Sequence, residues 1–299
     1  MRRTHHLLIA ILAVVVLAVS CGDDDGDDNA DPAAATVDTA ATVVETSTRT
    51  NGSETITWNV DGLIVHTYTN TEANFANSTA VIETEDSLVL IDAHFAETQA
   101  QDFRDFADSL DKPIDRIFIT HAHSDHIGGL ANAFADIDSY STAGVIAAAA
   151  EEGITITDEV EPSTIEIGGV TFRIDRYLDA EAEEQIVISI PAVGVMAIGD
   201  LIYSDTHAVM AQTFDSWLAI LDELEAIEGT TLVIPGHGTV GGPDVLFADM
   251  NGYLETAREL WEDNDDADAF SDAMVDAFPD RPGEGLLRFG APRLYPKEG

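Results

Sequence analysis

Basic residues and cysteine are scarce in this sequence. Only 13 of the 299 residues are Lys or Arg, against 56 Asp or Glu, and the formal net charge is −43. Nucleic acids and anionic lipid headgroups carry the same sign of charge, so we expect no nucleic-acid partner. The acidity is typical of a soluble surface, including one suited to high salt. With Cys21 as its single cysteine, the chain cannot form an internal disulfide.

An apolar run near the N-terminus, Leu7–Val19, is shorter than the roughly 20 residues that span a bilayer. It follows Arg2 and Arg3 and ends at Cys21, so residues 1–21 fit an export signal. They resemble a bacterial lipoprotein signal, although the leucine stands one place further from the cysteine than usual. We therefore expect an exported protein, lipid-anchored to the outer face of the cell membrane through Cys21. The alternative is an ordinary cleaved signal and a periplasmic or secreted protein.

Composition divides the rest of the chain into three parts. Residues 22–53 are rich in Asp, Ala, Thr and Ser without a hydrophobic period, which predicts an acidic disordered linker. Residues 54–262 carry the strand and helix patterns of one domain. Residues 263–299 predict a short helix at Asp268–Ala277 and a tail that packs on that domain.

Within the domain, short strands come first and mixed strands and helices follow. Asp61-Gly62 between two alternating runs predicts a hairpin. Helical spacing is expected at Phe95–Leu110, Gly128–Phe134, Val145–Glu152, Phe214–Ile227 and Pro243–Trp261. Strands are expected at Ile56–Val60, Leu63–Thr69, Thr79–Glu83, Ser87–Asp92, Arg116–Thr120, Ser163–Ile167, Val170–Tyr177, Gln185–Pro191, Val193–Ile198 and Thr231–Ile234. This order predicts an α/β fold in which two sheets pack face to face with helices outside.

The strongest chemical signal is a His-x-His-x-Asp-His motif just after the apolar strand Arg116–Thr120. Residues two apart on an extended segment point the same way, so His121 and His123 can share one metal ion. The chain then turns, and Asp125 with His126 can serve a second ion. Imidazole and carboxylate are ligands that zinc, iron and manganese accept.

Two later segments share one shape, an apolar strand that ends in a metal-ligand residue type. Val195–Gly199 precedes Asp200, and Leu232–Gly236 precedes His237. The flanking glycines let the backbone come close to a metal ion or a substrate. Each signal is weak alone, but together with the histidine motif, and in this order, they are specific.

On these motifs, with Leu90-Ile91-Asp92, the chain resembles the metallo-β-lactamase superfamily over about Thr55–Trp261. The resemblance implies a four-layer αβ/βα sandwich with a dinuclear site at one edge of the sheets. Its ligands would be His121 and His123 for metal one, with Asp125, His126 and His237 for metal two. Asp200 would bridge the two ions, and Asp92 would orient the motif loop. Asp125 would also orient the attacking water as the catalytic carboxylate.

One position departs from the commonest family pattern. Most members supply a third histidine to metal one, but this chain has no histidine between His126 and His207. Glu181 stands at that place, in a context similar to alkylsulfatase-like members, with Glu183 or Glu184 as alternatives. A carboxylate ligand makes iron or manganese a rival to zinc.

The resemblance implies a hydrolase with two divalent metal ions, most simply Zn²⁺, acting on a small molecule. We rank a carboxylic ester or lactone first and a sulfate ester second, and true β-lactamases generally lack the bridging aspartate found here as Asp200. Two other readings stay open, a mono-iron oxygenase of sulfur compounds and a non-catalytic metal- or ligand-binding lipoprotein. His66, His94 and His207 have no motif context and are expected to be structural, although the last two, like Tyr203, can line the pocket.

Overall fold

A computed structural model describes residues 41–95, 97–210 and 213–295. Residues 39–299 form one unit, separate from residues 1–38, and the description below concerns that unit. The predicted signal at residues 1–21, and the predicted linker up to residue 40, lie outside the described residues. In the described part of the chain, no helix is long and apolar enough to cross a membrane.

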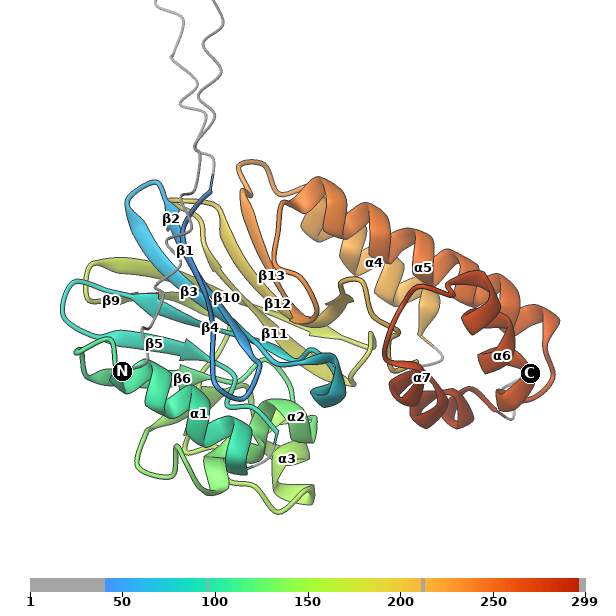
Figure 1. The fold of residues 1–299 in the computed structure, drawn as a ribbon, viewed down its shortest axis with the longest axis horizontal. Coiled ribbons are helices and arrows are strands. Elements are labelled where there is room, and N and C mark those ends of the chain that lie inside the picture. The colour runs from blue at the N-terminus through green and yellow to red at the C-terminus, as the bar shows by residue number, and fades with distance from the viewer. Residues whose placement is uncertain (1–40, 96, 211–212, 296–299) are drawn as a thin grey trace, which may run out of the picture. The chain divides into compact units, whose positions relative to one another are not determined.

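Two sheets form the centre of the unit (Figure 1). The first has eight strands in sequence order. They are β1 (Thr42–Thr48), β2 (Glu54–Val60), β3 (Leu63–Thr69), β4 (Ser78–Glu83), β5 (Leu88–Ile91), β6 (Ile114–Phe118), β7 (Ser139–Ser141) and β8 (Asp158–Glu159). Neighbours are antiparallel from β1 to β5 and parallel from β5 to β8.

The second sheet has five strands in the order β13-β12-β11-β10-β9. Its strands are β9 (Ser163–Ile167), β10 (Val170–Leu178), β11 (Glu184–Ile190), β12 (Val195–Tyr203) and β13 (Leu232–His237). All neighbours are antiparallel except β12 and β13, which run parallel. The carboxyl-terminal halves of β12 and β13 therefore lie together, with Asp200 inside β12 and His237 at the end of β13. The strand expected to end at Ile198 continues to Tyr203.

Side-chain alternation along the strands produces the four layers. In β5, Val89 and Ile91 belong to the core between the sheets, whereas Leu88 and Leu90 pack toward the helices. In β12, Val195 and Ala197 face the other sheet and Met196 and Ile198 face outward. The central strands of each sheet are thus buried on both faces, which confirms the predicted αβ/βα sandwich.

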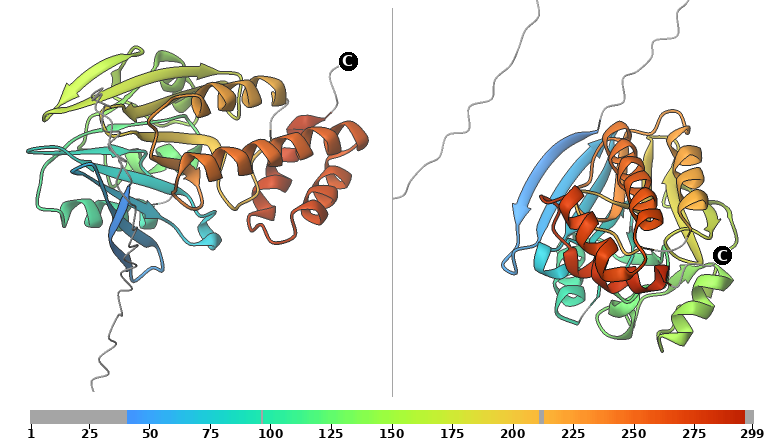
Figure 2. Two further views of the ribbon diagram at one scale, coloured as in Figure 1. Left: turned by 90° about the horizontal axis from the view of Figure 1, so that it is seen from above. Right: turned by 90° about the vertical axis from the view of Figure 1, so that its right-hand side faces the viewer.

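Helices cover the two outer faces, as Figures 1 and 2 show. On the first sheet, α1 (Glu97–Asp108) and α3 (Ala143–Glu151) bury apolar side chains in one core. On the second sheet, α4 (Phe214–Glu225) and α5 (Pro243–Asp263) do the same, and Trp217, Leu221 and Leu224 form a buried stripe along α4. The remaining helices are α2 (Ser124–Ile127), α6 (Ala267–Ala277), α7 (Glu284–Gly290) and the 3-10 turns η1 (Glu72–Asn74), η2 (Gly128–Ala131) and η3 (Ala291–Leu294).

The expected linker at residues 22–53 is wrong at its end, because β1 (Thr42–Thr48) lies inside it. All seven residues of β1 are exposed, so their side chains give no hydrophobic signal, and the strand forms through its backbone ladder with β2. Arg49, in the turn after β1, forms an ion pair with Asp102 of α1. Sequence composition cannot reveal a strand that is held by these long-range contacts.

Two helix predictions also need correction. The helix expected at Gly128–Phe134 is only the 3-10 turn η2, and a Cβ at Gly128 would lie 1.8 Å from the Phe95 carbonyl oxygen. The glycine thus serves close backbone packing. After the predicted helix at Asp268–Ala277, confirmed as α6, the expected tail contains the further helix α7 and the turn η3. Leu287 and Leu294 are fully buried there, so packing stabilises this short segment.

Candidate metal centre

The histidine motif spans the loop after β6 and the single-turn helix α2. His123 has extended backbone angles directly before α2, whereas Asp125 and His126 lie within its turn. The change of direction separates the four side chains into two pairs. His121 and His126 are fully buried, and the side chain of His123 is about one third exposed.

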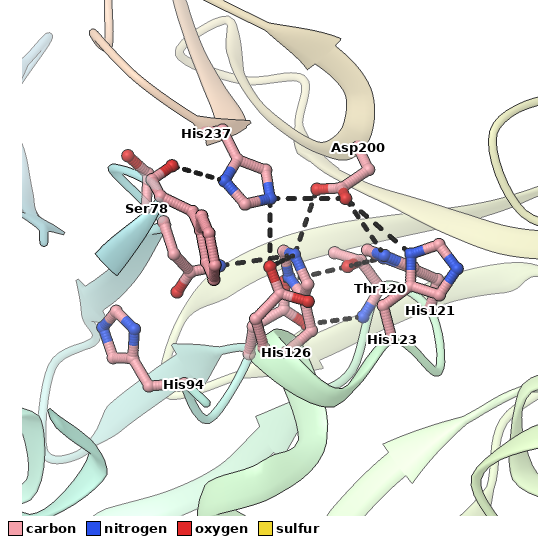
Figure 3. Close-up of polar contacts among 12 residues, drawn as sticks. Ser78, His94, Thr120, His121, His123, His126, Asp200 and His237 are labelled. Atoms are coloured by element: carbon pink, nitrogen blue, oxygen red, sulfur yellow. Dashed lines mark hydrogen bonds and ion pairs between the residues drawn. The ribbon is translucent and has the colours of Figure 1, made fainter. Parts of the chain in front are cut away.

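The seven side chains predicted to bind metal lie together. Figure 3 labels five of them, His121, His123, His126, Asp200 and His237. The seven side chains form two groups, and within each group the candidate ligand atoms lie within 4.8 Å of one another. The first group is His121, His123, Glu181 and Asp200. The second group is Asp125, His126 and His237.

Asp200 lies between the groups and contacts members of both. Its Oδ2 atom is 3.4 Å from His121 Nε2 and 3.4 Å from His237 Nε2. Its Oδ1 atom is 3.0 Å from His126 Nε2. A carboxylate placed in this way can contribute one oxygen to a cation on either side.

Glu181 lies beside the two histidines of the first group. Its Oε1 atom is 3.2 Å from His123 Nδ1, and its Oε2 atom is 3.9 Å from His121 Nε2. Glu183 is exposed, and the Glu184 carboxylate packs against Gly144 at the start of α3. Of the three neighbouring glutamates, the structure therefore brings Glu181 alone to the histidines.

Hydrogen bonds behind the cluster fix the orientation of its imidazole rings. Nδ1 of His126 donates to the Asp92 carboxylate at 2.8 Å, and Nδ1 of His237 donates to the Phe75 carbonyl at 2.8 Å. Asp92 also accepts from the Thr120 amide and hydroxyl, both at 2.8 Å. With Nδ1 occupied, Nε2 of each ring is the atom that faces the centre.

Two glycines let the strands approach the centre. Gly199 has a φ of 57° where the β12–β13 register shifts, so the strand bends just before Asp200. A Cβ at Gly236 would lie 1.9 Å from Asp200 Oδ1. Gly236 is thus required for the carboxylate to reach its position between the two groups.

The electrostatics of the centre favour cations. Burial alone would lower the pKa of His126, but Asp200, Asp92 and Asp125 together raise it well above its usual value. Burial would also lower the pKa of His123, but Glu181 and Asp200 outweigh burial and raise this pKa to about 9. Burial raises the pKa of Glu181 itself above its usual value. The cluster therefore has a negative potential that would attract metal ions and protons alike.

Unpartnered atoms support a fit to metal ions. His121 Nε2 and Glu181 Oε2 are buried and have no hydrogen-bond partner. A buried polar atom without a partner costs about 1–3 kcal/mol, so such atoms need an explanation. These two atoms belong to the same candidate ligand group, and a metal ion bound there would satisfy both.

The centre opens into a cavity of about 570 Å³. His123, Asp125, Asp200 and Tyr203 line one part of it. The Tyr203 hydroxyl donates to Asp200 Oδ2 at 2.6 Å, and its ring stacks on His237 with the planes 3° apart. Tyr203 is therefore both a cavity residue and a hydrogen-bond partner of the centre.

The three histidines without motif context lie elsewhere. His66 pairs with Glu83, and His207 forms a hydrogen bond with the Tyr253 hydroxyl. His94 is buried beside Asn70 and stands apart from the cluster in Figure 3. None of the three is among the residues that line the cavity, so the expectation that His94 and His207 can do so is wrong.

Sequence reasoning missed several contributors to the centre. Asn77 forms a β-bridge with His237, and its Nδ2 lies 3.3 Å from His126 Nε2. Phe75 contributes a backbone carbonyl, which no sequence pattern can identify. The apolar cavity wall from the C-terminal segment was missed as well, because only folding brings it to the histidine motif.

The family model described as the metallo-beta-lactamase superfamily matches residues 73–266, more than half of the chain. No curated protein matches. Similar solved structures include a metallo-beta-lactamase from Pontibacter korlensis, with 18% identity and a TM-score of 0.55, which covers 72% of this chain and 99% of that one. The metallo-beta-lactamase FIM-1 from Pseudomonas aeruginosa, in a mono-zinc form, has 21% identity and a TM-score of 0.55. The match covers 73% of this chain and 96% of that one. A metallo-beta-lactamase from Hirschia baltica has 22% identity and a TM-score of 0.54. The match covers 72% of this chain and 97% of that one. At these identities the likeness establishes the fold.

Proposed function

Because the chain belongs to the metallo-β-lactamase superfamily, we propose that it is a hydrolase that binds two divalent metal ions and cleaves an ester-like small molecule. The observation that carries the proposal is the pair of ligand groups that share Asp200. A carboxylic ester or lactone is the preferred substrate, and a sulfate ester is second.

The first ion would be held by His121, His123 and Glu181, and the second by Asp125, His126 and His237, with Asp200 between them. Zn²⁺ is the simplest choice for this mixture of imidazole and carboxylate, and the carboxylates make Fe or Mn alternatives. When bound, such ions would activate a water molecule and polarise the substrate's carbonyl group.

The protein's own side chains would position the reaction. The Asp125 carboxylate lines the cavity, and although burial would raise its pKa, His126 and His237 hold the pKa well below the usual value. It is therefore ionised and can accept a hydrogen bond from the attacking water. Tyr203 also lines the cavity, and its hydroxyl donates to Asp200 Oδ2 and so fixes the orientation of that carboxylate.

Metal content tests this proposal directly. We expect two metal ions per purified full-length chain, matching the two ligand groups, and about one in Glu181→Ala. Glu183→Ala is the matched control, because Glu183 is an exposed glutamate two residues away, and should leave the content unchanged. Mass spectrometry of the metals would be combined with assays on aryl esters, lactones, a sulfate ester and a β-lactam.

Other outcomes would overturn the proposal. A single iron, unaffected by Glu181→Ala, would favour an oxygenase of sulfur compounds. No metal at all would favour a binding protein. Two ions without turnover of any substrate in the screen would remove the ester-like substrate class.

Export belongs to the same proposal. Support comes from the Leu7–Val19 run and from Cys21, at which a lipid anchor would hold the enzyme at the outer face of the membrane. The net charge of −43 argues against direct binding to anionic headgroups. Recovery of Cys21→Ser in the membrane fraction to the same extent as wild type would contradict the anchor.

A further inference from the structure

The segment 284–294, made of α7 and η3, lies beyond the residues that the family model matches and still reaches the cavity. Leu286, Phe289 and Arg293 of this segment line the cavity. One wall of the cavity is therefore built by a part of the chain outside the matched family region. A wall of this kind can decide which substrate the shared metal centre receives.

The wall is held firmly in place. Leu287 and Leu294 are fully buried in the outer core of the second sheet. A Cβ at Gly290 would lie 2.6 Å from the Met210 backbone nitrogen, so the end of α7 packs directly on the loop after β12. Its inner face therefore presents a defined surface to the cavity.

Arg281, three residues before α7, fastens the segment to that loop. Its guanidinium donates to the Thr206 carbonyl at 3.0 Å and pairs with Asp249. The same group lies 4.5 Å from the centre of the Tyr253 ring. These contacts join the start of the wall to α5 and to the loop that follows Tyr203.

The surface that the cavity presents is largely apolar and partly exposed. In the described part of the chain, the exposed phenylalanines are Phe95 and Phe289, with 45% and 66% of their surface accessible, and both line the cavity. Phe75, Val209 and Leu286 line it as well. Exposed aromatic rings that converge on one cavity beside a polar centre are typical of a ligand site.

We infer that this wall binds the apolar chain of the substrate while the reacting group lies at the metal centre, an inference that rests on the proposed function. The ligand would be a neutral ester or lactone with a medium-length alkyl chain. Its polar end would meet His123, Asp125 and Tyr203, and its chain would cover Phe95, Leu286 and Phe289. A volume of about 570 Å³ is within the range that holds such small molecules.

Two assays on the full chain test the inference. The first measures kcat/KM for 4-nitrophenyl esters from acetate to decanoate, and the second measures Kd for methyl ketones of matching chain length, which cannot be hydrolysed. In wild type, each added methylene should raise kcat/KM and lower Kd about threefold to fourfold, until the alkyl chain covers the wall. Phe289→Ser should flatten the dependence on chain length, so that kcat/KM falls far more for the decanoate ester than for the acetate ester.

The controls separate the wall from the chemistry. Val245→Ser removes a similarly exposed apolar side chain on α5, with 71% of its surface accessible and outside the cavity lining, and should behave as wild type. Phe95→Ser changes a cavity residue far from Phe289 in the sequence, and it should reproduce the effect of Phe289→Ser. Both phenylalanines are exposed, so their replacement should leave the core intact.

The outcomes are distinguishable. Ketone binding that depends on chain length in wild type and not in Phe289→Ser supports the inference even if no ester is hydrolysed, in which case only the proposed function fails. Ester hydrolysis with no dependence on chain length overturns the inference and leaves the hydrolase standing. The same chain-length dependence in wild type and Phe289→Ser also overturns it.

Discussion

Gly236 is the residue at which a single methyl group would disturb the candidate metal centre. A Cβ there would lie 1.9 Å from Asp200 Oδ1 and 2.8 Å from the Gly199 carbonyl carbon. Both atoms belong to buried backbone or to a buried carboxylate, so neither can move aside easily. Because Asp200 faces both ligand groups, its displacement would affect both at once.

We expect Gly236→Ala to lose most of its bound metal and to lower stability by about 1–3 kcal/mol through overpacking. Gly241→Ala is the control, because its Cβ would meet no atom within 4 Å. Metal content and urea unfolding of the two purified variants would be compared with wild type. Wild-type metal content in Gly236→Ala would show that Asp200 is not needed where the structure places it.

At the scale of elements, the β1–β2 hairpin depends on α1. Asp102 of α1 accepts hydrogen bonds from Arg49, in the hairpin turn, and from the Tyr68 hydroxyl at 2.7 Å. Burial would raise the pKa of Asp102, but Arg49 and Tyr68 outweigh it and hold the pKa below the usual 3.8. The ionised carboxylate is thus favoured by the folded state.

This shift gives a prediction with a definite sign. A carboxyl group whose pKa is lower in the folded state stabilises the protein above its unfolded pKa, and loses this effect as pH falls through the folded value. We therefore expect Asp102→Asn to cost about 0.5–1 kcal/mol at pH 7, and the difference from wild type to shrink below about pH 4. Denaturant unfolding at several pH values measures this difference in the free energy of unfolding between Asp102→Asn and wild type.

The exposed Asp105 of the same helix offers the matched control. Asp105→Asn should differ little from wild type at either pH. If Asp102→Asn differed from wild type by the same amount at pH 7 and at pH 3, its carboxylate charge would have no part in holding the hairpin.

At the scale of the whole molecule, the charge of −43 works against the folded state, because like charges repel one another more strongly in a compact chain. Raising ionic strength from about 0.1 M to about 1 M shortens the Debye length from about 10 Å to about 3 Å. We expect this screening to add about 1–2 kcal/mol of stability, which would raise Tm by roughly 3–6 °C.

Thermal unfolding in NaCl, compared with sucrose at equal osmolality, separates screening from solute exclusion. Sucrose stabilises folded proteins without screening charge, so its effect should be the smaller one. An equal rise in both solutes would mean that charge repulsion contributes little to the stability of this protein.

The sequence alone determined the layers and predicted most of the side chains that the structure gathers in the candidate metal centre. A continuous apolar run, as in Leu88–Ile91, is a local property that marks a strand with two buried faces, because successive side chains point to opposite sides of the sheet. His121, His123, Asp125 and His126 lie within six consecutive positions, and the strand-end residues Asp200 and His237 carry their own glycine signals. Their roles as ligands remain predictions until metal is measured.

Only the tertiary structure decided which of several similar residues reaches the centre. Glu181 and Glu183 have the same chemistry, but one is buried beside His123 and the other is exposed. The pairing of β1, the Phe75 carbonyl at His237 and the cavity wall of α7 likewise depend on contacts between segments far apart in the chain. Such contacts leave no periodic signal, because each is set by the packing of the whole fold and not by the residues next to it.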